Sequence, residues 1–219
     1  SMAPVRQAAI GPMLVGRELE ELCWEPVKMD DPRLTAHPDW LKEFRDFAWS
    51  DSSSLTLHQS ARIERTEKGF QTWIYNRTDY DALLAMLENR GFSLPTADEW
   101  AYLCGGGCRT LFPWGDGLDY SMRLRWFEDM DEDENRPYDM EEPNFFGLSI
   151  AYDPYMREVV KAEQFTTCGG DGGRSICGGL GIFLGFLPCS PHYKPEVQED
   201  KELNGDYDFY RPMIRVEAI

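Results

Sequence analysis

The chain has 219 residues, of which 42% are hydrophobic and 13% aromatic, enough for one ordinary domain or two small ones and too apolar for a disordered chain. Its 39 acidic and 22 basic residues give a formal net charge of −17, which repels nucleic acid and anionic membranes. No apolar run is long enough to cross a bilayer and no secretion signal is recognisable, so we expect a cytoplasmic protein with no membrane and no nucleic-acid partner.

Residues 1–36 mix prolines, glycines and charges with short apolar pieces, and we expect them to form an arm that wraps the domain. Asp39 is expected to cap the short amphipathic helix that follows. Residues 61–66 and 70–75 alternate apolar and polar side chains, a pattern that predicts two strands joined by a turn at 68–69.

Two helices are predicted next. Thr78 is expected to cap the first, and Gly91 to end it. Thr96 and Glu99 have the spacing of a capping box, in which each side chain bonds the backbone amide of the other residue. This second helix is expected to carry Trp100 into the core.

Regular periodicity fades after residue 104. Residues 128–142 contain nine acidic side chains and one arginine, which is typical of a solvated loop and also suits a docking surface for a basic partner. Residues 169–185 contain eight glycines, too many for a simple helix or a central strand. The whole pattern predicts an α+β domain with many loops.

The six cysteines stand at positions 23, 104, 108, 168, 177 and 189. In the absence of a secretion signal, we expect them to be reduced thiols. None of the spacings is CxxC, and the CxxxC at 104–108 has no nearby histidines, so a structural zinc site is not expected.

Five short segments, in the same order along the chain, resemble motifs of the formylglycine-generating enzymes, the sulfatase-modifying-factor family. Residues 92–102 resemble RLPTEAEWEYA, and residues 112–116 resemble YPWGD. Residues 143–148 resemble PNxFGL, residues 172–173 the GG of a GGS motif, and residues 209–212 the closing GFR. The resemblance covers roughly residues 92–219.

This resemblance implies a C-type-lectin-like fold for residues 51–219, with residues 1–50 as an N-terminal extension that packs on the domain. Its LPTxxEW motif implies a helix start with a buried Trp100, and its PWG motif implies a loop anchored by a buried Trp114. Both motifs are structural, so the resemblance in fold does not by itself define the chemistry.

Enzymes of this family oxidise a peptide cysteine with oxygen, and they hold one copper ion with two cysteines in a pattern like GGSxxCxxxxC. Soft thiolates suit Cu(I). The resemblance places Cys177 at the first cysteine position and Ile182 at the second. One thiolate is a poor copper site, so we expect the two-cysteine copper chemistry to be absent unless loops bring Cys168 or Cys189 near Cys177.

Calcium is the family's other ion, bound by loop carbonyls and by a segment with Asn and Glu. In this chain Pro154 and Arg157 stand at those two positions, so the ligands are not kept. The alternating carboxylates of Asp129–Asp133 resemble a calcium loop, but the required glycine and the closing glutamate are missing. No cofactor is therefore assigned.

We predict that the glycine-rich stretch forms the floor or rim of a pocket, because glycine lets backbone pass close to a ligand or to another loop. Within and beside it, Asp171 and Arg174 supply opposite charges for ligand binding, together with the thiols of Cys168 and Cys189. Cys177 is the candidate for reactive chemistry. His192 is the candidate for acid–base work. The alternative is that these thiols are small buried hydrophobic groups and that His192 lies on the surface.

The main functional hypothesis is a divergent family member with a pocket for a small molecule or peptide and without the copper oxidase activity. One alternative is a cysteine- or metal-dependent oxidase or oxygenase that uses Cys177 with Cys168 or Cys189. The other is a protein-interaction module that offers the acidic segment 128–142 to a basic protein.

Overall fold

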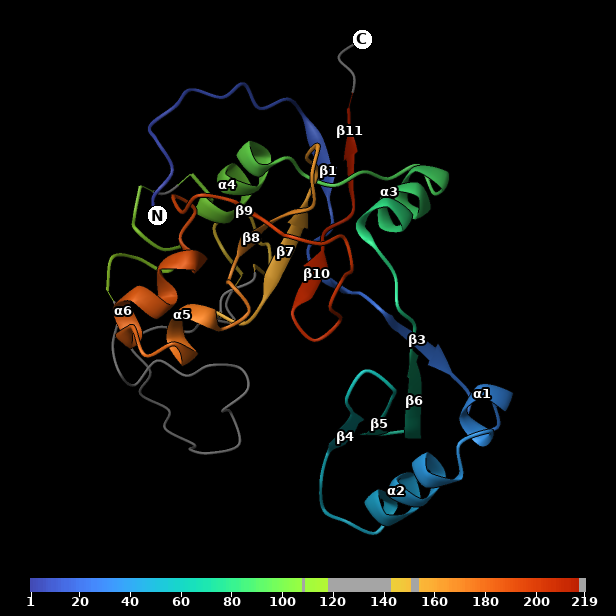
Figure 1. Ribbon diagram of the computed structural model, residues 1–219. Helices are drawn as coiled ribbons and strands as arrows, with labels where there is room; N and C mark the ends of the chain where they lie inside the picture. Colours follow the sequence, from blue (N-terminus) through green and yellow to red (C-terminus); the bar gives the residue numbers. More distant parts are fainter. Residues whose placement is uncertain (108, 118–142, 151–153, 217–219) are drawn as a thin grey trace. The chain divides into compact units, whose positions relative to one another are not determined.

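The computed structural model describes residues 1–107, 109–117, 143–150 and 154–216, and it is an α+β structure. The acidic segment 128–142 therefore lies outside the described residues. The chain forms two compact units (Figure 1). The first comprises residues 1–20, 79–201 and 206–219, and the second comprises residues 21–78 and 202–205. Among the described residues, no helix has both the length and the apolar character needed to span a bilayer.

The second unit is a four-stranded antiparallel sheet with two helices, α1 (Pro32–Thr35) and α2 (Pro38–Ala48). The strand order is β3 (Trp24–Val27), β6 (Gly69–Tyr75), β5 (Ala61–Thr66) and β4 (Ser54–Leu57). The predicted hairpin is confirmed, because β5 and β6 pair through the turn at 67–68. The core of this unit consists of buried side chains from the sheet and both helices: Leu34, Phe44, Phe47, Ala61, Ile63 and Ile74.

Two predicted helix caps are wrong. Helix α2 begins at Pro38, after His37, and Asp39 lies inside the first turn, because a proline ring already has the φ of a first helical residue. Helix α3 (Tyr80–Asn89) is capped by Asp79, whose carboxylate accepts the amide of Ala82 at 2.8 Å. The neighbouring Thr78 is not the cap.

The first unit is built around a mixed sheet. The strand order of this sheet is β2 (Glu20–Glu21), which spans the boundary between the two units, then β10 (Asp208–Tyr210), β7 (Arg157–Val160), β8 (Thr166–Gly169) and β9 (Glu196–Val197). Strands β10 and β7 run parallel, whereas β7 and β8, and β8 and β9, run antiparallel. A separate antiparallel pair joins β1 (Met13–Val15) to β11 (Met213–Arg215), so the N-terminal residues are more regular than the expected arm.

Helix α4 (Ala97–Gly105) packs against this sheet. The predicted capping box is confirmed: the Thr96 amide donates to Glu99 at 2.7 Å, and the Glu99 amide donates to Thr96 at 3.3 Å. Trp100 is buried, as predicted, with only 2% of its surface exposed. It belongs to an apolar cluster of α4, β7, β8 and the segment before β7: Trp100, Leu103, Cys104, Leu148, Ile150, Val160 and Cys168.

The glycine-rich stretch folds as two short helices, α5 (Arg174–Cys177) and α6 (Gly181–Phe186), followed by the 3-10 helix η2 (Leu187–Cys189). They enclose a small apolar cluster around Phe112, Phe186 and Cys189. Trp114 stacks on Phe112 at the edge of this cluster, with ring centroids 4.8 Å apart. Because it is only half-buried, the prediction of a buried Trp114 is wrong.

A fully buried ion pair joins the C-terminal segment to β7. Arg211 and Glu158 both have 0% exposed surface, and the Arg211 Nε donates to Glu158 at 3.0 Å. The same guanidinium donates to the carbonyl oxygens of Gly16, Arg17 and Ser149. Arg211 therefore connects four separate segments of the first unit.

Candidate functional site

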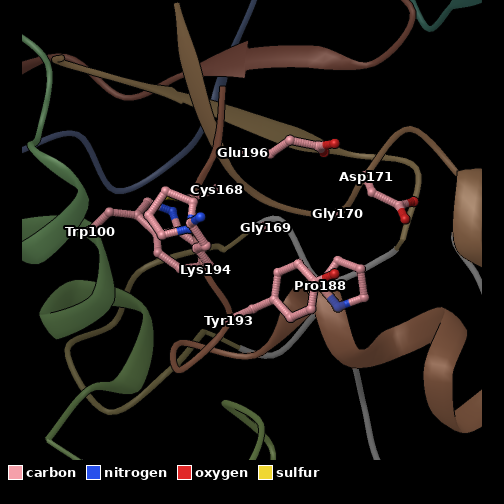
Figure 2. A pocket seen from close by; sticks show the side chains of 10 residues that line it. Trp100, Cys168, Gly169, Gly170, Asp171, Pro188, Tyr193, Lys194 and Glu196 are labelled. Carbon is pink, nitrogen blue, oxygen red and sulfur yellow. The ribbon is translucent and has the colours of Figure 1, made fainter. Parts of the chain in front are cut away.

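A cavity opens in the first unit where strands β8 and β9 separate. Their pairing ends with Thr167 opposite Glu196. Beyond that pair, residues 168–171 form one wall and residues 193–196 the other, with Trp100 and Pro188 completing the lining (Figure 2). Its free volume is about 10 Å³, which is room for about one water molecule.

Two residues of this lining each carry a buried polar atom that has no hydrogen-bond partner among the described residues. One is the indole Nε1 of Trp100, a donor, and the other is Oδ1 of Asp171, an acceptor. The two side chains are 2% and 7% exposed. Because a buried polar group without a partner costs about 1–3 kcal/mol, a molecule that supplies the missing bonds gains a corresponding free energy.

The other oxygen of Asp171 is fully engaged. It accepts the amide of Ser175 at 3.0 Å and the hydroxyl of the same residue at 2.5 Å. These two bonds hold the carboxylate at the start of α5 and fix its orientation. Oδ1 is consequently presented as a preorganised acceptor.

The side of the cavity near Asp171 is acidic. In Figure 2 the carboxylates of Asp171 and Glu196 and the hydroxyl of Tyr193 lie on one side, and Trp100 and Lys194 on the other. Glu196 is balanced by Arg174, with 2.6 Å between the charged atoms. The pKa of the Tyr193 hydroxyl is raised by burial and, to a smaller extent, by the carboxylates of Asp171 and Glu196. The phenol therefore stays neutral and available as a donor at neutral pH.

Gly170 determines how closely the cavity wall approaches the chain before β7. A Cβ at this position would lie 2.4 Å from the carbonyl oxygen of Pro154 and 2.5 Å from that of Met156. The Gly170 amide donates to the Met156 oxygen at 2.6 Å, and the Asp171 amide donates to the Pro154 oxygen at 2.9 Å. The glycine is thus required by a loop of the domain itself, one of the two alternatives left open by the sequence, and this contact places Asp171 in the wall.

The structure brings together three of the six predicted site residues. Cys168 and Asp171 line the cavity, and Arg174 lies beside them, because its Nε donates to the Asp171 carbonyl oxygen at 3.1 Å. Most of the Arg174 side chain is exposed.

The other three predicted residues lie outside the cavity lining. Cys177 is exposed at the end of α5, with its Sγ 3.2 Å from the hydroxyl oxygen of Tyr155. Cys189 is buried in the apolar cluster of Phe112. His192 is exposed, and its Nε2 is 3.1 Å from the Thr110 carbonyl oxygen.

Sequence reasoning missed four residues of the lining: Trp100 as a polar donor, Tyr193, Lys194 and Glu196. Trp100 was predicted only as a core anchor. Its indole N–H is the signal that was available, because a buried tryptophan normally bonds that group to a neighbouring acceptor. The remaining three carry no local motif, and only the end of the β8–β9 ladder brings them to the cavity.

The three thiols at positions 168, 177 and 189 are not gathered into one site. Cys168 belongs to the apolar cluster of α4, Cys189 to that of Phe112, and Cys177 lies exposed beside Tyr155. Burial, and secondarily the charge of Glu158, raises the pKa of the Cys168 thiol, which disfavours the thiolate that copper requires. Across the described ranges, no three histidine, cysteine or acidic side chains gather in a metal-binding group.

The calcium-binding segment of the resembled family also fits poorly. The carbonyl oxygens of Pro154 and Met156 accept amide bonds from the glycine-rich loop, and the carboxylate of Glu158 is buried against Arg211. Tyr152, Asp153 and the carboxylates of Asp129–Asp133 lie outside the described residues.

Comparison of the sequence with models of protein families and with curated proteins gives no match. The chemical character of the site therefore comes from its own geometry. It combines a buried donor, a buried acceptor and charged side chains of both signs around a water-sized cavity.

Proposed function

We propose that this chain is a divergent formylglycine-generating-enzyme-like domain that binds a small molecule or peptide between β8 and β9 and lacks the two-cysteine copper oxidase activity. The observation that carries this proposal is that two residues of one cavity lining each have a buried polar atom, Trp100 Nε1 and Asp171 Oδ1, without a partner among the described residues. A ligand that bonds both atoms removes two desolvation costs at once.

The placement of the resembling motifs supports the proposal. The capping box of the LPTxxEW-like segment starts the helix that carries Trp100 to the cavity. In the PNxFGL-like segment, the Asn144 amide donates to the carbonyl oxygen of Leu103 at 2.5 Å, near the C-terminal end of that helix. These contacts hold the indole in place from both ends of α4.

The binding proposal is tested by a thermal-shift screen of small polar metabolites and short peptides on the full chain. A ligand present at 100 times its Kd stabilises the folded protein by about 2.7 kcal/mol, which raises Tm by several degrees. We expect hits to lose their effect on the Asp171→Asn variant and to keep it on Glu163→Gln, an exposed carboxylate outside the lining. Hits that shift both variants equally would place the binding elsewhere.

The second half of the proposal is tested with a peptide containing the CxPxR sequence of sulfatases. The peptide, the protein and added copper are incubated in air, and the peptide mass is measured. We expect no formylglycine, because the second copper position holds Ile182. Conversion of the peptide cysteine would show that another thiol completes the copper site.

A further inference from the structure

The two unpartnered atoms of the cavity have opposite requirements. Trp100 Nε1 needs an acceptor, whereas Asp171 Oδ1 needs a donor. Figure 2 shows the two side chains on opposite sides of the cavity, with the Gly169–Gly170 backbone running between them. A ligand that satisfies both atoms must therefore carry an acceptor at one end and a donor at the other.

The charged side chains of the lining indicate which charge each end of the ligand should carry. Arg174 neutralises Glu196, so the Asp171 side keeps one unbalanced carboxylate. On the Trp100 side, Lys194 has no ion-pair partner within the part of the chain that the structure describes. An ammonium is favoured next to Asp171 because a charge-assisted hydrogen bond is about twice as strong as a neutral one. A carboxylate is favoured next to Trp100 and Lys194 for the same reason.

We infer that the ligand is a small zwitterion, such as a free amino acid, with its ammonium on Asp171 and its carboxylate on the indole N–H of Trp100 and on Lys194. This inference rests on the proposed binding function and names its ligand class. The free volume of about 10 Å³ is smaller than such a molecule, so binding requires side chains of the lining to move. Lys194 is already exposed to solvent, so its reorientation breaks no ion pair.

The probes are the ω-amino acids from β-alanine to 6-aminohexanoate, which vary the separation of the two charges. For each length, the matched controls are the n-alkylamine and the n-alkylcarboxylate, which carry one charge only. Isothermal titration calorimetry with the full chain measures binding. We expect one member of the zwitterion series to bind at least tenfold more tightly than either of its single-charge controls.

Three variants assign the contacts. Asp171→Asn removes the charge that holds the ammonium, Trp100→Phe removes the indole N–H while keeping an aromatic ring, and Lys194→Met removes the second charge. Each is expected to weaken binding of the best zwitterion at least tenfold. Lys161→Met, an exposed lysine outside the lining, is the matched control and should bind like the wild type. Urea unfolding of each variant shows that a loss of binding is not a loss of fold.

The outcomes separate the two proposals. If an amine or a carboxylate alone binds as tightly as the zwitterion and remains sensitive to Asp171→Asn, the ligand class is wrong while the binding cavity stands. Wild-type affinity for the zwitterion in Trp100→Phe or Lys194→Met would also overturn the inferred ligand class. If neither the probes nor the broader screen bind, and Asp171→Asn and Trp100→Phe are more stable than the wild type, the proposed function itself fails.

Discussion

Replacing Arg211 by methionine tests how much the buried ion pair between Arg211 and Glu158 stabilises the first unit. The side chain makes five hydrogen bonds, two to Glu158 and one each to the carbonyl oxygens of Gly16, Arg17 and Ser149. Methionine keeps much of the apolar stem and removes every donor, so the change isolates the polar part of the interaction.

The expected loss follows from what remains buried. Glu158 has 0% exposed surface, and a buried charge that loses its partner costs about 3–5 kcal/mol. The Arg17 carbonyl oxygen adds less to the loss, because it still accepts a hydrogen bond from the Ser149 amide at 2.9 Å. The carbonyl oxygens of Gly16 and Ser149 add to the cost. We therefore expect Arg211→Met to lower the free energy of unfolding by at least about 4 kcal/mol.

Urea unfolding followed by circular dichroism and tryptophan fluorescence measures this loss. The double variant Arg211→Met with Glu158→Gln removes the stranded charge as well, and we expect it to recover about 1–3 kcal/mol of the deficit. A deficit below about 1 kcal/mol for Arg211→Met would refute the reasoning, since water would then have to reach Glu158. A double variant no more stable than the single one would show that the stranded carboxylate is not the source of the loss.

Three further predictions concern the capping box, the cavity wall and the thiols. Burial raises the pKa of Glu99, but hydrogen bonds from Arg215 and from Thr96 outweigh burial and lower it. The ionised Glu99 therefore stabilises the folded protein fully above the unfolded pKa of about 4.3, and this stabilisation is lost as the pH falls through the folded pKa. Urea titrations should therefore show Glu99→Gln losing about 1 kcal/mol at pH 7 and closing the gap to wild type in acid. Gly170→Ala should lower the free energy of unfolding by about 2–3 kcal/mol, whereas Gly11→Ala, with nothing within 4 Å of its Cβ, should be nearly neutral; equal losses would contradict the close approach. Peptide mapping after brief labelling with a small thiol reagent should find Cys177 modified before Cys168, whose thiol pKa is raised by burial, and the opposite order would show that the cavity wall opens readily.

Elements with strong local signals can be predicted from the amino-acid sequence alone. The hairpin of β5 and β6 follows from strand periodicity on both sides of a short turn. The start of α4 follows from Thr96 and Glu99, which bond backbone amides only three residues away. In both cases the interacting groups are close neighbours in the chain, so contacts with distant segments do not change the local structure.

Where two local signals have similar strength, contacts between distant segments select one of them. Thr78 and Asp79 are both good N-cap residues. The carbonyl oxygen of Thr78 accepts the amide of Leu203, a residue 125 positions away, and Asp79 becomes the cap. Trp114 stands in a motif typical of a buried anchor, but the apolar cluster beside it is small and the side chain is only half-buried.

The cavity itself depends entirely on contacts between distant segments. Trp100, Asp171 and Glu196 come from a helix, a loop and a strand, and no spacing rule relates them. Sequence composition indicated a pocket near the glycines and identified Asp171, but the glycines serve the packing of the domain's own loop. An unpaired donor or acceptor has no signature in a sequence, because whether a polar atom finds a partner is decided only when the chain has folded around it.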